Sequence, residues 1–515
     1  MANVIKLIWQ WPYVSTWKIT RYNLILFFPI VHVIASEPFL MRLFCITHPG
    51  GFMSALTAGA AVSNITPWLG VAIPGNFRPQ YGADIHDELL AKALVLDNGE
   101  KRIAMVTCDV IAMPEKIAQA AKMRILKRCG ITPDCVMINA THTHSGAGIA
   151  DLLDVKEDAD YTAWLPLKIA DAVELAMRRL RPACIGFASV NEDRIAFYRR
   201  WRMKDGTVHT NPGRNHSDLV EPMGKIDPEL AMIYVEGLDG LPIAVAASFS
   251  LHYIGVDKGD EVSADYFGHF YHQMRHYLGG DCVPLLWNAA SGQINNIDFS
   301  GNRVWTNRGH IQAKRMANVL AGHVITEIQL MDMQSDLELN AAVDTLTFSP
   351  KMITADDLAI SQRIVTGDCE YTTGPFSWVV GQPIPKDRVE VYAKECLRLA
   401  RLPQQMTAPI QVFKLGSAAI VALPGEIFVE SGFRIKAQSQ ASPLMLVSLA
   451  NGYIGYVCTD DALTQEGGYE TWAALSSLGG VGTAPALEKM SVDLLHKLGL
   501  QGRGKKKEEK QDISS

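Results

Sequence analysis

Residues 138–148, INATHTHSGAG, contain two histidines whose type and spacing could do chemistry. His142 and His144 stand one residue apart, after an apolar run and before small residues. In an extended backbone, residues i and i+2 point to the same side, so we expect both imidazoles to face one pocket. One imidazole could then hold a metal ion while the other transfers a proton. The pair also fits a hydrogen-bonded polar loop, and the residues alone leave these interpretations open.

The segments before these histidines predict the edge of a sheet. Residues 102–108 (RIAMVTC) and 135–140 (CVMINA) have the pattern of buried strands, and residues 114–130 between them have the pattern of a helix. This succession predicts a βαβ unit, in which the two strands pair in parallel. His142 and His144 therefore follow the carboxyl end of a strand, where α/β proteins build their sites.

Further predicted strands also end in residues that could contribute to a site. They are residues 242–252, ending in His252; 418–426, ending in Glu426; 444–456, ending in Tyr453 and Tyr456; and 283–296, opening into an Asn, Ser and Gln loop. Taken singly, His252 fits a core histidine and Glu426 fits a carboxylate at a helix N-terminus. Two imidazoles and a carboxylate together are the ligand set of a catalytic zinc site with an open position for water. We therefore predict an α/β fold with mixed, partly parallel sheets and a metal site at the carboxyl ends of strands.

The composition excludes some classes of protein. The chain has 515 residues, of which 48% are hydrophobic and 20% charged, so it can bury a large core and is not globally disordered. Its net charge of −6 gives no basic field to recruit nucleic acid, so we expect no nucleic-acid partner. The nine cysteines form no CxxC pair and lie mostly in apolar runs. We expect buried free thiols, which favours a reducing compartment.

The chain divides into three parts. Residues 53–500 show no internal repeat and no long linker, so we expect one catalytic α/β domain there. Residues 1–52 contain NLILFFPIVHVIA after basic residues, which is typical of a signal or anchor-like segment and predicts a secreted or membrane-associated protein. Alternatively, they are an upstream extension, translation starts at Met53 and the protein is cytoplasmic. Residues 501–515, rich in Lys and Glu, predict a disordered charged tail.

Several motifs resemble the neutral/alkaline non-lysosomal ceramidase family, specifically its N-terminal catalytic domain. In chain order they are LGVAIPG, IHDELLAKALVLDN, THTHSGAG, HYIGV with SADYFG, LPGEIF and GYIGYVCTD. THTHSG is the most specific of them, and the resemblance covers most of residues 53–500. It implies a zinc-dependent amidase that acts on ceramide or a related N-acyl lipid.

The resemblance also implies roles for individual residues. The implied zinc ligands are the first histidine of THTHSG, the histidine after the next long strand, the glutamate of LPGEIF and the tyrosine before VCT, which are His142, His252, Glu426 and Tyr456. The residues implied to contact the reacting group are the second histidine of THTHSG, the arginine of the YR pair and the tyrosine of GGYE, which are His144, Arg199 and Tyr469. The implied cofactor is Zn2+.

One loop departs from the family pattern and bears on the nucleophile. In NAASGQINN, Ala289 stands where the resemblance leads us to expect a serine, and Gln293 stands in place of an aspartate. Ser291 would reach the site only through a shifted loop. Metal-activated water is therefore the expected nucleophile.

The predicted function is a zinc-dependent hydrolase of the neutral ceramidase type that cleaves the amide bond of an N-acyl lipid. A first alternative keeps the metal but acts on a small polar amide or ester, such as a sugar derivative, because Tyr198 replaces the asparagine that precedes the arginine in the family. A second alternative is a non-catalytic binding module on the same fold, against which the retention of every predicted ligand argues. His86, in DIHDELL, could reach the same edge, although a structural role is the simpler interpretation.

Overall fold

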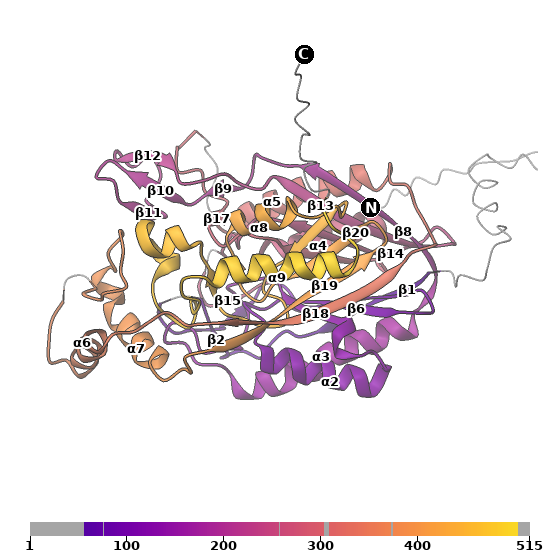
Figure 1. Cartoon of the computed structure of the whole chain (residues 1–515). Helices are drawn as coiled ribbons and strands as arrows, with labels where there is room; N and C mark the ends of the chain where they lie inside the picture. Colours follow the sequence, from indigo (N-terminus) through magenta and orange to yellow (C-terminus); the bar gives the residue numbers. More distant parts are fainter. Residues whose placement is uncertain (1–55, 76, 257, 303–307, 372–373, 503–515) are drawn as a thin grey trace, which may run out of the picture. The chain divides into compact units, whose positions relative to one another are not determined.

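The computed structural model describes residues 56–75, 77–256, 258–302, 308–371 and 374–502 (Figure 1). The predictions for residues 1–52 lie outside the described residues, as do those for residues 503–515 of the predicted tail. The described residues belong to one compact unit, Met53–Ser515. In this part of the chain, none of the helices combines the length and the apolar character needed to cross a bilayer.

The largest element is an eight-stranded sheet of order β16-β14-β13-β8-β1-β5-β6-β7. Its strands are β1 (Thr57–Asn64), β5 (Leu90–Asp97), β6 (Arg102–Cys108), β7 (Val136–Ala140), β8 (Arg181–Asn191), β13 (Glu229–Gly237), β14 (Pro242–Phe249) and β16 (Val283–Asn288). The outermost pairs, β6 with β7 and β14 with β16, are parallel. The pairs between them are antiparallel. The predicted α/β fold with mixed, partly parallel sheets is confirmed.

The βαβ unit predicted before the two histidines is present. Helix α2 (Glu115–Cys129) connects β6 to β7, and Ile117, Ala121 and Ile125 lie buried on one of its faces. The helix ends at Gly130, whose φ of 70° is a left-handed conformation that glycine adopts without steric cost. Every residue of β7 is buried, as expected for a strand covered on both faces.

A four-stranded sheet packs against one face of the large sheet. Its order is β18-β19-β20-β22, with β18 (Leu339–Phe348), β19 (Met406–Leu415), β20 (Ala418–Ala422) and β22 (Leu444–Val447). One hydrophobic core is continuous between the sheets and joins Met105 and Ile138 of the large sheet to Phe413 and Met445 of the small one. Removal of these facing surfaces from water is the main force that holds the sheets together.

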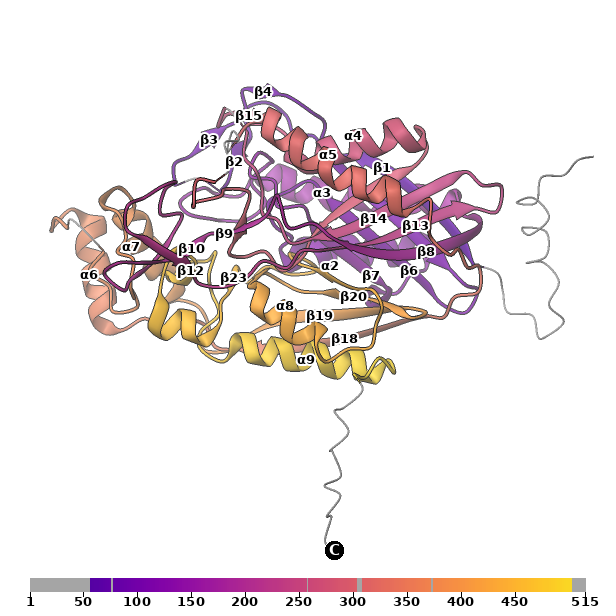
Figure 2. The same ribbon diagram turned by 90° about the horizontal axis from the view of Figure 1, so that it is seen from above.

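Helices cover the outer faces of both sheets (Figure 2). α4 (Asp265–Leu278) and α5 (His310–Glu327) share a second buried cluster with β13, β14 and β16. α3 (Ala159–Arg178) packs with α2 beside β1 and β5. α8 (Val429–Lys436) and α9 (Thr483–Lys497) pack together over the small sheet. The layers therefore run helix, sheet, sheet, helix.

Short strand pairs lie around the loops that carry the predicted site residues. They are β2 (Ala72–Ile73) with β3 (Gln80–Tyr81), β4 (Asp84–Ile85) with β15 (Glu261–Val262), β9 (Phe197–Tyr198) with β17 (Ile294–Asn295), and β21 (Glu426–Ile427) with β23 (Tyr456–Val457). A three-stranded sheet contains β10 (Arg200–Met203), β11 (Val208–Thr210) and β12 (Leu219–Pro222). The remaining helices are α6 (Ala355–Thr366) and α7 (Val389–Leu399).

The strand predicted over residues 418–426 is interrupted. β20 ends at Ala422, and Glu426 begins the separate strand β21. Pro424 lies in the interruption and has no N–H to donate to a neighbouring strand, which accounts for the break. The interruption turns Glu426 away from the small sheet and toward Tyr456, its partner across the β21–β23 pair.

Candidate metal centre

Three histidines meet beyond the carboxyl ends of β7 and β14. His142 and His144 follow β7, and His252 follows β14. Nε2 of His142 lies 3.1 Å from Nε2 of His252 and 3.1 Å from Nε2 of His144. One ligand atom from each ring lies within 4.8 Å of the other two. Loops that follow two different strands thus bring three imidazoles to one point.

The backbone at His142 differs from the extended backbone expected from the sequence. Its φ of 76° lies in the left-handed region, which is uncommon for a residue with a Cβ atom. Such a conformation costs about 1–3 kcal/mol and persists when the surroundings enforce it. Here the N–H of His142 donates to the carbonyl oxygen of Val110 at 3.0 Å. The extended segment was a wrong prediction, but the kinked loop still directs both rings to the same point.

The hydrogen bonds of the rings fix where their protons lie. Each Nδ1 lies near a backbone carbonyl oxygen, 2.6 Å from that of Ile111 for His142, 3.2 Å from that of Ser291 for His252 and 3.3 Å from that of Gly75 for His144. Because a carbonyl oxygen only accepts, each Nδ1 carries the proton and each Nε2 presents a lone pair. The short Nε2–Nε2 distances are therefore contacts between lone pairs and not hydrogen bonds.

Burial keeps two of these rings uncharged. Burial lowers the pKa of His252 well below its usual value, and the charge of Arg199 lowers it further. Burial likewise lowers the pKa of His144, with His142 as the next cause. The neutral imidazole is the form that binds a metal, so both rings are ready to act as ligands.

Glu426 adds a negative charge to the cluster. Its Oε2 lies 3.4 Å from Nε2 of His142 and 3.5 Å from Nε2 of His252. Oε1 accepts a hydrogen bond from the hydroxyl of Tyr453 at 2.8 Å, whereas the buried Oε2 has no hydrogen-bond donor among the described residues. Burial alone would raise the pKa of Glu426, but hydrogen bonds from nearby tyrosine hydroxyls help to hold it below its usual value. An ionised oxygen therefore faces lone pairs without a donor between them.

These atoms fit a metal ion. Lone pairs and an anionic oxygen repel one another unless a cation lies among them. In a tetrahedral zinc site with bonds of about 2.0–2.1 Å, the ligand atoms are about 3.3–3.4 Å apart. The separations of 3.1, 3.4 and 3.5 Å among His142, His252 and Glu426 are close to that spacing. The residues present thus suit zinc in both donor type and spacing.

Tyr456 and Arg199 lie beside this cluster. The Tyr456 ring is parallel to the His252 ring, with the centroids 6.4 Å apart. Nη2 of Arg199 donates to the Tyr456 hydroxyl at 3.1 Å. Burial raises the pKa of Tyr456, and so does Glu426, whereas Arg199 opposes the rise. Tyr456 therefore stands between a carboxylate and a guanidinium, beside the histidine cluster.

Arg199 is held rigidly by its other contacts. Its Nε donates to Glu470 Oε1 at 2.8 Å, and Nη2 also donates to the carbonyl oxygen of Gly292 at 2.6 Å. The pairing of β9 with β17 sets the backbone, because the N–H of Arg199 donates to Gln293 O at 3.0 Å. Within the described residues, Nη1 makes no hydrogen bond. One donor of a fixed guanidinium therefore remains for a substrate.

Comparison with known proteins identifies the family. No family model matches the sequence. Neutral ceramidase of Pseudomonas aeruginosa is 24% identical over 478 residues, a match that covers 81% of this chain and 68% of the relative. Neutral ceramidase A of Dictyostelium discoideum is 22% identical over 487 residues, covering 76% of this chain and 65% of the relative. These matches support the neutral ceramidase family, which the sequence motifs also resemble.

Solved structures of the neutral ceramidase family share this fold. The crystal structure of neutral ceramidase from Pseudomonas aeruginosa superposes with a TM-score of 0.65 at 18% sequence identity, covering 87% of this chain and 75% of that one. A structure of ceramidase complexed with C2 gives a TM-score of 0.64 at 16% identity, covering 87% of this chain and 76% of that one. At these identities the likeness concerns the fold alone.

Tyr469, assigned from the resemblance to neutral ceramidases, forms part of a wall of aromatic rings. Its ring meets the Tyr456 ring edge-on, with the centroids 5.7 Å apart. It meets the Phe77 ring in the same manner at 6.1 Å. All seven residues to which the resemblance assigned roles therefore lie at or next to the histidine cluster, while their individual roles stay predictions.

The loop that departs from the neutral ceramidase pattern contacts the cluster through its backbone. The carbonyl oxygen of Ser291 accepts from His252 Nδ1, and the Ser291 hydroxyl donates to Asn288 Oδ1. Ala289 is buried and has no group for chemistry. The hydroxyl of Ser291 is thus engaged with an amide, which agrees with water as the expected nucleophile.

Sequence reasoning missed contacts that shape the site of this neutral ceramidase relative. Tyr253 stacks on His144 with ring centroids 3.6 Å apart. Gly75 has φ of +95°, and a Cβ there would clash with His144 Nδ1. Glu470 binds Arg199 as described above. Tyr253 and Glu470 are sequence neighbours of His252 and Tyr469, so adjacency could have suggested them, whereas no local signal points from Gly75 to His144.

His86 lies apart from the cluster. Its ring stacks on that of His310 with centroids 3.4 Å apart, and its Nδ1 lies 2.8 Å from Asp87 Oδ1. The simpler interpretation made from the sequence, a structural role, fits these contacts.

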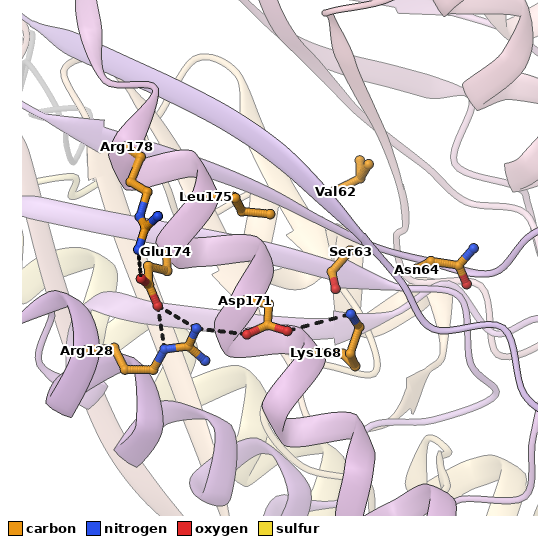
Figure 3. Close-up of a pocket in the computed structure, with 9 residues that line it drawn as sticks. All are labelled: Val62, Ser63, Asn64, Arg128, Lys168, Asp171, Glu174, Leu175 and Arg178. Carbon is orange, nitrogen blue, oxygen red and sulfur yellow. Dashed lines mark hydrogen bonds and ion pairs between the residues drawn. The ribbon is translucent and has the colours of Figure 1, made fainter.

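A surface pocket of about 350 Å³ lies over β1 and α3 and is separate from the cluster (Figure 3). Figure 3 shows Arg128 between Asp171 and Glu174, with Lys168 and Arg178 at the ends of the row. Arg128 bonds to Asp171 at 2.8 Å, and Arg178 bonds to Glu174 at 2.5 Å. Each charged side chain of the row is ion-paired with a neighbour, so none of them is left free for a ligand.

Proposed function

We propose that the protein is a zinc-dependent hydrolase that cleaves the amide bond of an N-acyl lipid of the ceramide type. The observation that carries this proposal is that the Nε2 lone pairs of His142 and His252 converge on the buried, donor-free Oε2 of Glu426, with Nε2 of His144 beside that of His142. A non-catalytic binding module has no need for such a cluster. Family membership supports a hydrolase, and the names of the relatives supply ceramide as the first substrate to test.

His142, His252 and Glu426 would hold the metal, with Tyr456 as the fourth ligand. Bound zinc would supply a Lewis acid for the amide carbonyl and an activated water as nucleophile. Nδ1–H groups bonded to backbone carbonyl oxygens orient His142 and His252, as is usual for metal-binding histidines. The cluster is buried, so its electrostatic interactions are little weakened by water.

His144 would move the proton. Its Nδ1–H is engaged by Gly75, so Nε2 is free to accept a proton from the attacking water. The same atom can then give that proton to the nitrogen of the leaving amine. Stacking against Tyr253 keeps the ring in the plane needed for both transfers.

Arg199 and Tyr469 would stabilise the negative charge that develops on the carbonyl oxygen. Arg199 keeps Nη1 for this purpose, while Glu470 and Gly292 fix the rest of the guanidinium. Donors fixed before the reaction act strongly in a buried site, because they need no reorganisation when charge develops. The Tyr469 hydroxyl is the second candidate donor.

The experiment is metal analysis combined with an activity screen. Purified protein should contain about one zinc per chain, release fatty acid from N-acyl sphingosines, lose activity on chelation and regain it with added zinc. The acyl length should be varied, because the structure does not fix it. Protein that carries no metal as purified and gains no activity from zinc, cobalt or manganese contradicts the proposal.

A further inference from the structure

Arg388, at the start of helix α7, brings a cation to the aromatic wall of the site; we call helices α6 and α7 the α6–α7 arm (Figure 1). Tyr392 of the arm packs edge-on against Trp472, with ring centroids 5.2 Å apart, and lies 6.2 Å from the Phe77 ring. Arg388, at the start of α7, places its guanidinium 4.0 Å from the centroid of Phe77. Since Phe77 also meets Tyr469 at 6.1 Å, a single aromatic ring separates Arg388 from Tyr469.

Arg388 has no carboxylate partner among the described residues. None of the ion pairs in this part of the chain includes it, and its buried Nε has no hydrogen-bond acceptor. Asp387, its neighbour in the sequence, is exposed, and Glu395 of the same helix is bound to Arg398 at 2.5 Å. A buried N–H without an acceptor is costly, so this position calls for an acceptor from outside the chain.

A second arginine without an ion-pair partner among the described residues, Arg308, lies near the turn that follows Tyr253. Arg308 packs over the turn after Tyr253, where a Cβ on Gly255 would lie 3.0 Å from its guanidinium. The N–H of Gly309 donates to Gly255 O at 2.7 Å, which ties this segment to the turn. Arg308 is exposed and likewise has no ion-pair partner within the described ranges. By contrast, Arg199 is paired with Glu470.

We propose that the substrate carries an anionic group, a carboxylate, sulfonate or phosphate, that Arg388 binds directly and that Arg308 attracts. This inference rests on the proposed function and names the substrate class of the same site. A guanidinium presents parallel N–H groups that match two oxygens of an oxyanion, and stacking on Phe77 fixes its plane. A neutral ceramide head group offers hydroxyls and would leave both arginines without a counter-charge.

Matched substrate pairs test the proposal. One series joins a lauroyl chain to ω-amino acids of increasing spacer length, and each member is compared with the amide of the amino alcohol of equal length. A second series places the carboxylate or the hydroxyl at the end of the acyl chain. The two series distinguish an anion on the amine side from one on the acyl side. Zinc-loaded, full-length protein is used throughout, and kcat/KM is measured together with binding by calorimetry.

The wild-type protein should favour the anionic member of at least one pair by about tenfold or more in kcat/KM, as expected for one charged hydrogen bond. Arg388→Gln should abolish that preference while leaving the neutral member unchanged, and Arg388→Lys should restore part of it. Arg363→Gln removes the same charge from α6 of the same arm and should change nothing.

The proposal is overturned if no spacer length in either series gives a preference, or if Arg388→Gln leaves the preference intact. Calorimetry separates this outcome from failure of the proposed function. Suppose that anionic amides bind in a manner that depends on Arg388 but are not hydrolysed. This result would contradict the proposed hydrolase and support the proposed anion site. Hydrolysis of both members of every pair at equal rates would support the proposed hydrolase and contradict the proposed anion site.

Discussion

Glu426 and Tyr456 lie directly opposite each other in the parallel pair of β21 and β23, although a helix and a strand separate them in the sequence. This pairing brings a donor-free carboxylate oxygen and a phenol to the same side of the histidine cluster. Arg199 contacts the phenol from the opposite direction at 3.1 Å. Backbone pairing thus fixes the position of Tyr456, and the hydrogen bond from the charged Arg199 orients its hydroxyl.

Tyr456→Phe tests whether this hydroxyl holds the metal. The ring packing is kept, so the protein should fold normally. Loss of the hydroxyl should weaken zinc binding more than the roughly 10–100-fold typical of a residue that only orients a ligand. Zinc affinity is measured by competition with a chromogenic chelator. An unchanged affinity would leave His144 as the fourth ligand.

Gly75→Ala tests the positioning of His144. The added Cβ would clash with His144 Nδ1, and a displaced catalytic group can cost about 100-fold in kcat. Gly70→Ala is the matched control, because Gly70 also has a positive φ, of +84°, but no atom stands near its Cβ position. Both variants should lose about 1–2 kcal/mol of stability from the backbone alone. Equal activities of the two folded variants would show that Gly75 does not position His144.

The strands around the site could be predicted because their patterns are local. The buried runs of β6 and β7 and the helix between them are visible in the sequence, and they place His142 and His144 at a strand end. The break between β20 and β21 was missed, although Pro424 is a local signal for it. The strand-end pattern also pointed to Tyr456, whereas only the resemblance connected Arg199 to the same centre.

The remaining features of the site depend on contacts between segments that are distant in the sequence. Gly75 reaches His144 across the fold, and Arg388 reaches the site only because the α6–α7 arm packs on Trp472. The left-handed backbone of His142 likewise depends on its neighbours, since the local sequence THTH does not by itself require a positive φ. Such relationships arise from tertiary packing and leave no periodic signal in the sequence.

A buried ion pair beneath the site gives a prediction about stability. Nζ of Lys92 contacts both carboxylate oxygens of Asp109, at 2.7 and 2.8 Å, and both side chains are almost fully buried. Lys92→Met leaves the Asp109 charge unpaired and should cost about 3–5 kcal/mol of unfolding free energy. Lys92→Met combined with Asp109→Asn should recover much of that loss, because the amide still accepts from the N–H of Leu90. Urea denaturation measures the free energy of unfolding of both variants. Equal losses in the single and the double variant would contradict the prediction that the unpaired charge of Asp109 causes the destabilisation.

Ser291→Ala tests the nucleophile. The Ser291 hydroxyl is engaged by Asn288, so the variant should keep most of its activity. Loss of a principal catalytic group costs about 100–1,000-fold. A decrease of that size in a variant that keeps its zinc would mean that Ser291 attacks the substrate and that the loop rearranges on binding.

His142 and His144 can be separated by their zinc contents. Nε2 of His142 is 3.1 Å from Nε2 of His252 and 3.4 Å from Oε2 of Glu426, so His142→Ala should lose zinc and activity together. His144 has Tyr253 and Gly75 as its other contacts, so His144→Ala should keep close to one zinc per chain. Its kcat should nevertheless fall by about 100–10,000-fold, the usual contribution of a general acid or base.

Elemental analysis, circular dichroism and turnover on the same preparations decide between the two roles. Both variants should remain folded, because the rings stand on loops beyond the ends of strands. Equal loss of zinc from both would make His144 a ligand, since its Nε2 is also 3.1 Å from that of His142. The proton transfer would then fall to another group, with Arg199 and Tyr469 as the nearest candidates. Retention of zinc by both variants would mean that the metal is bound elsewhere in the protein. It would contradict the metal centre itself, because the lone pairs that converge there would then have no cation to bind.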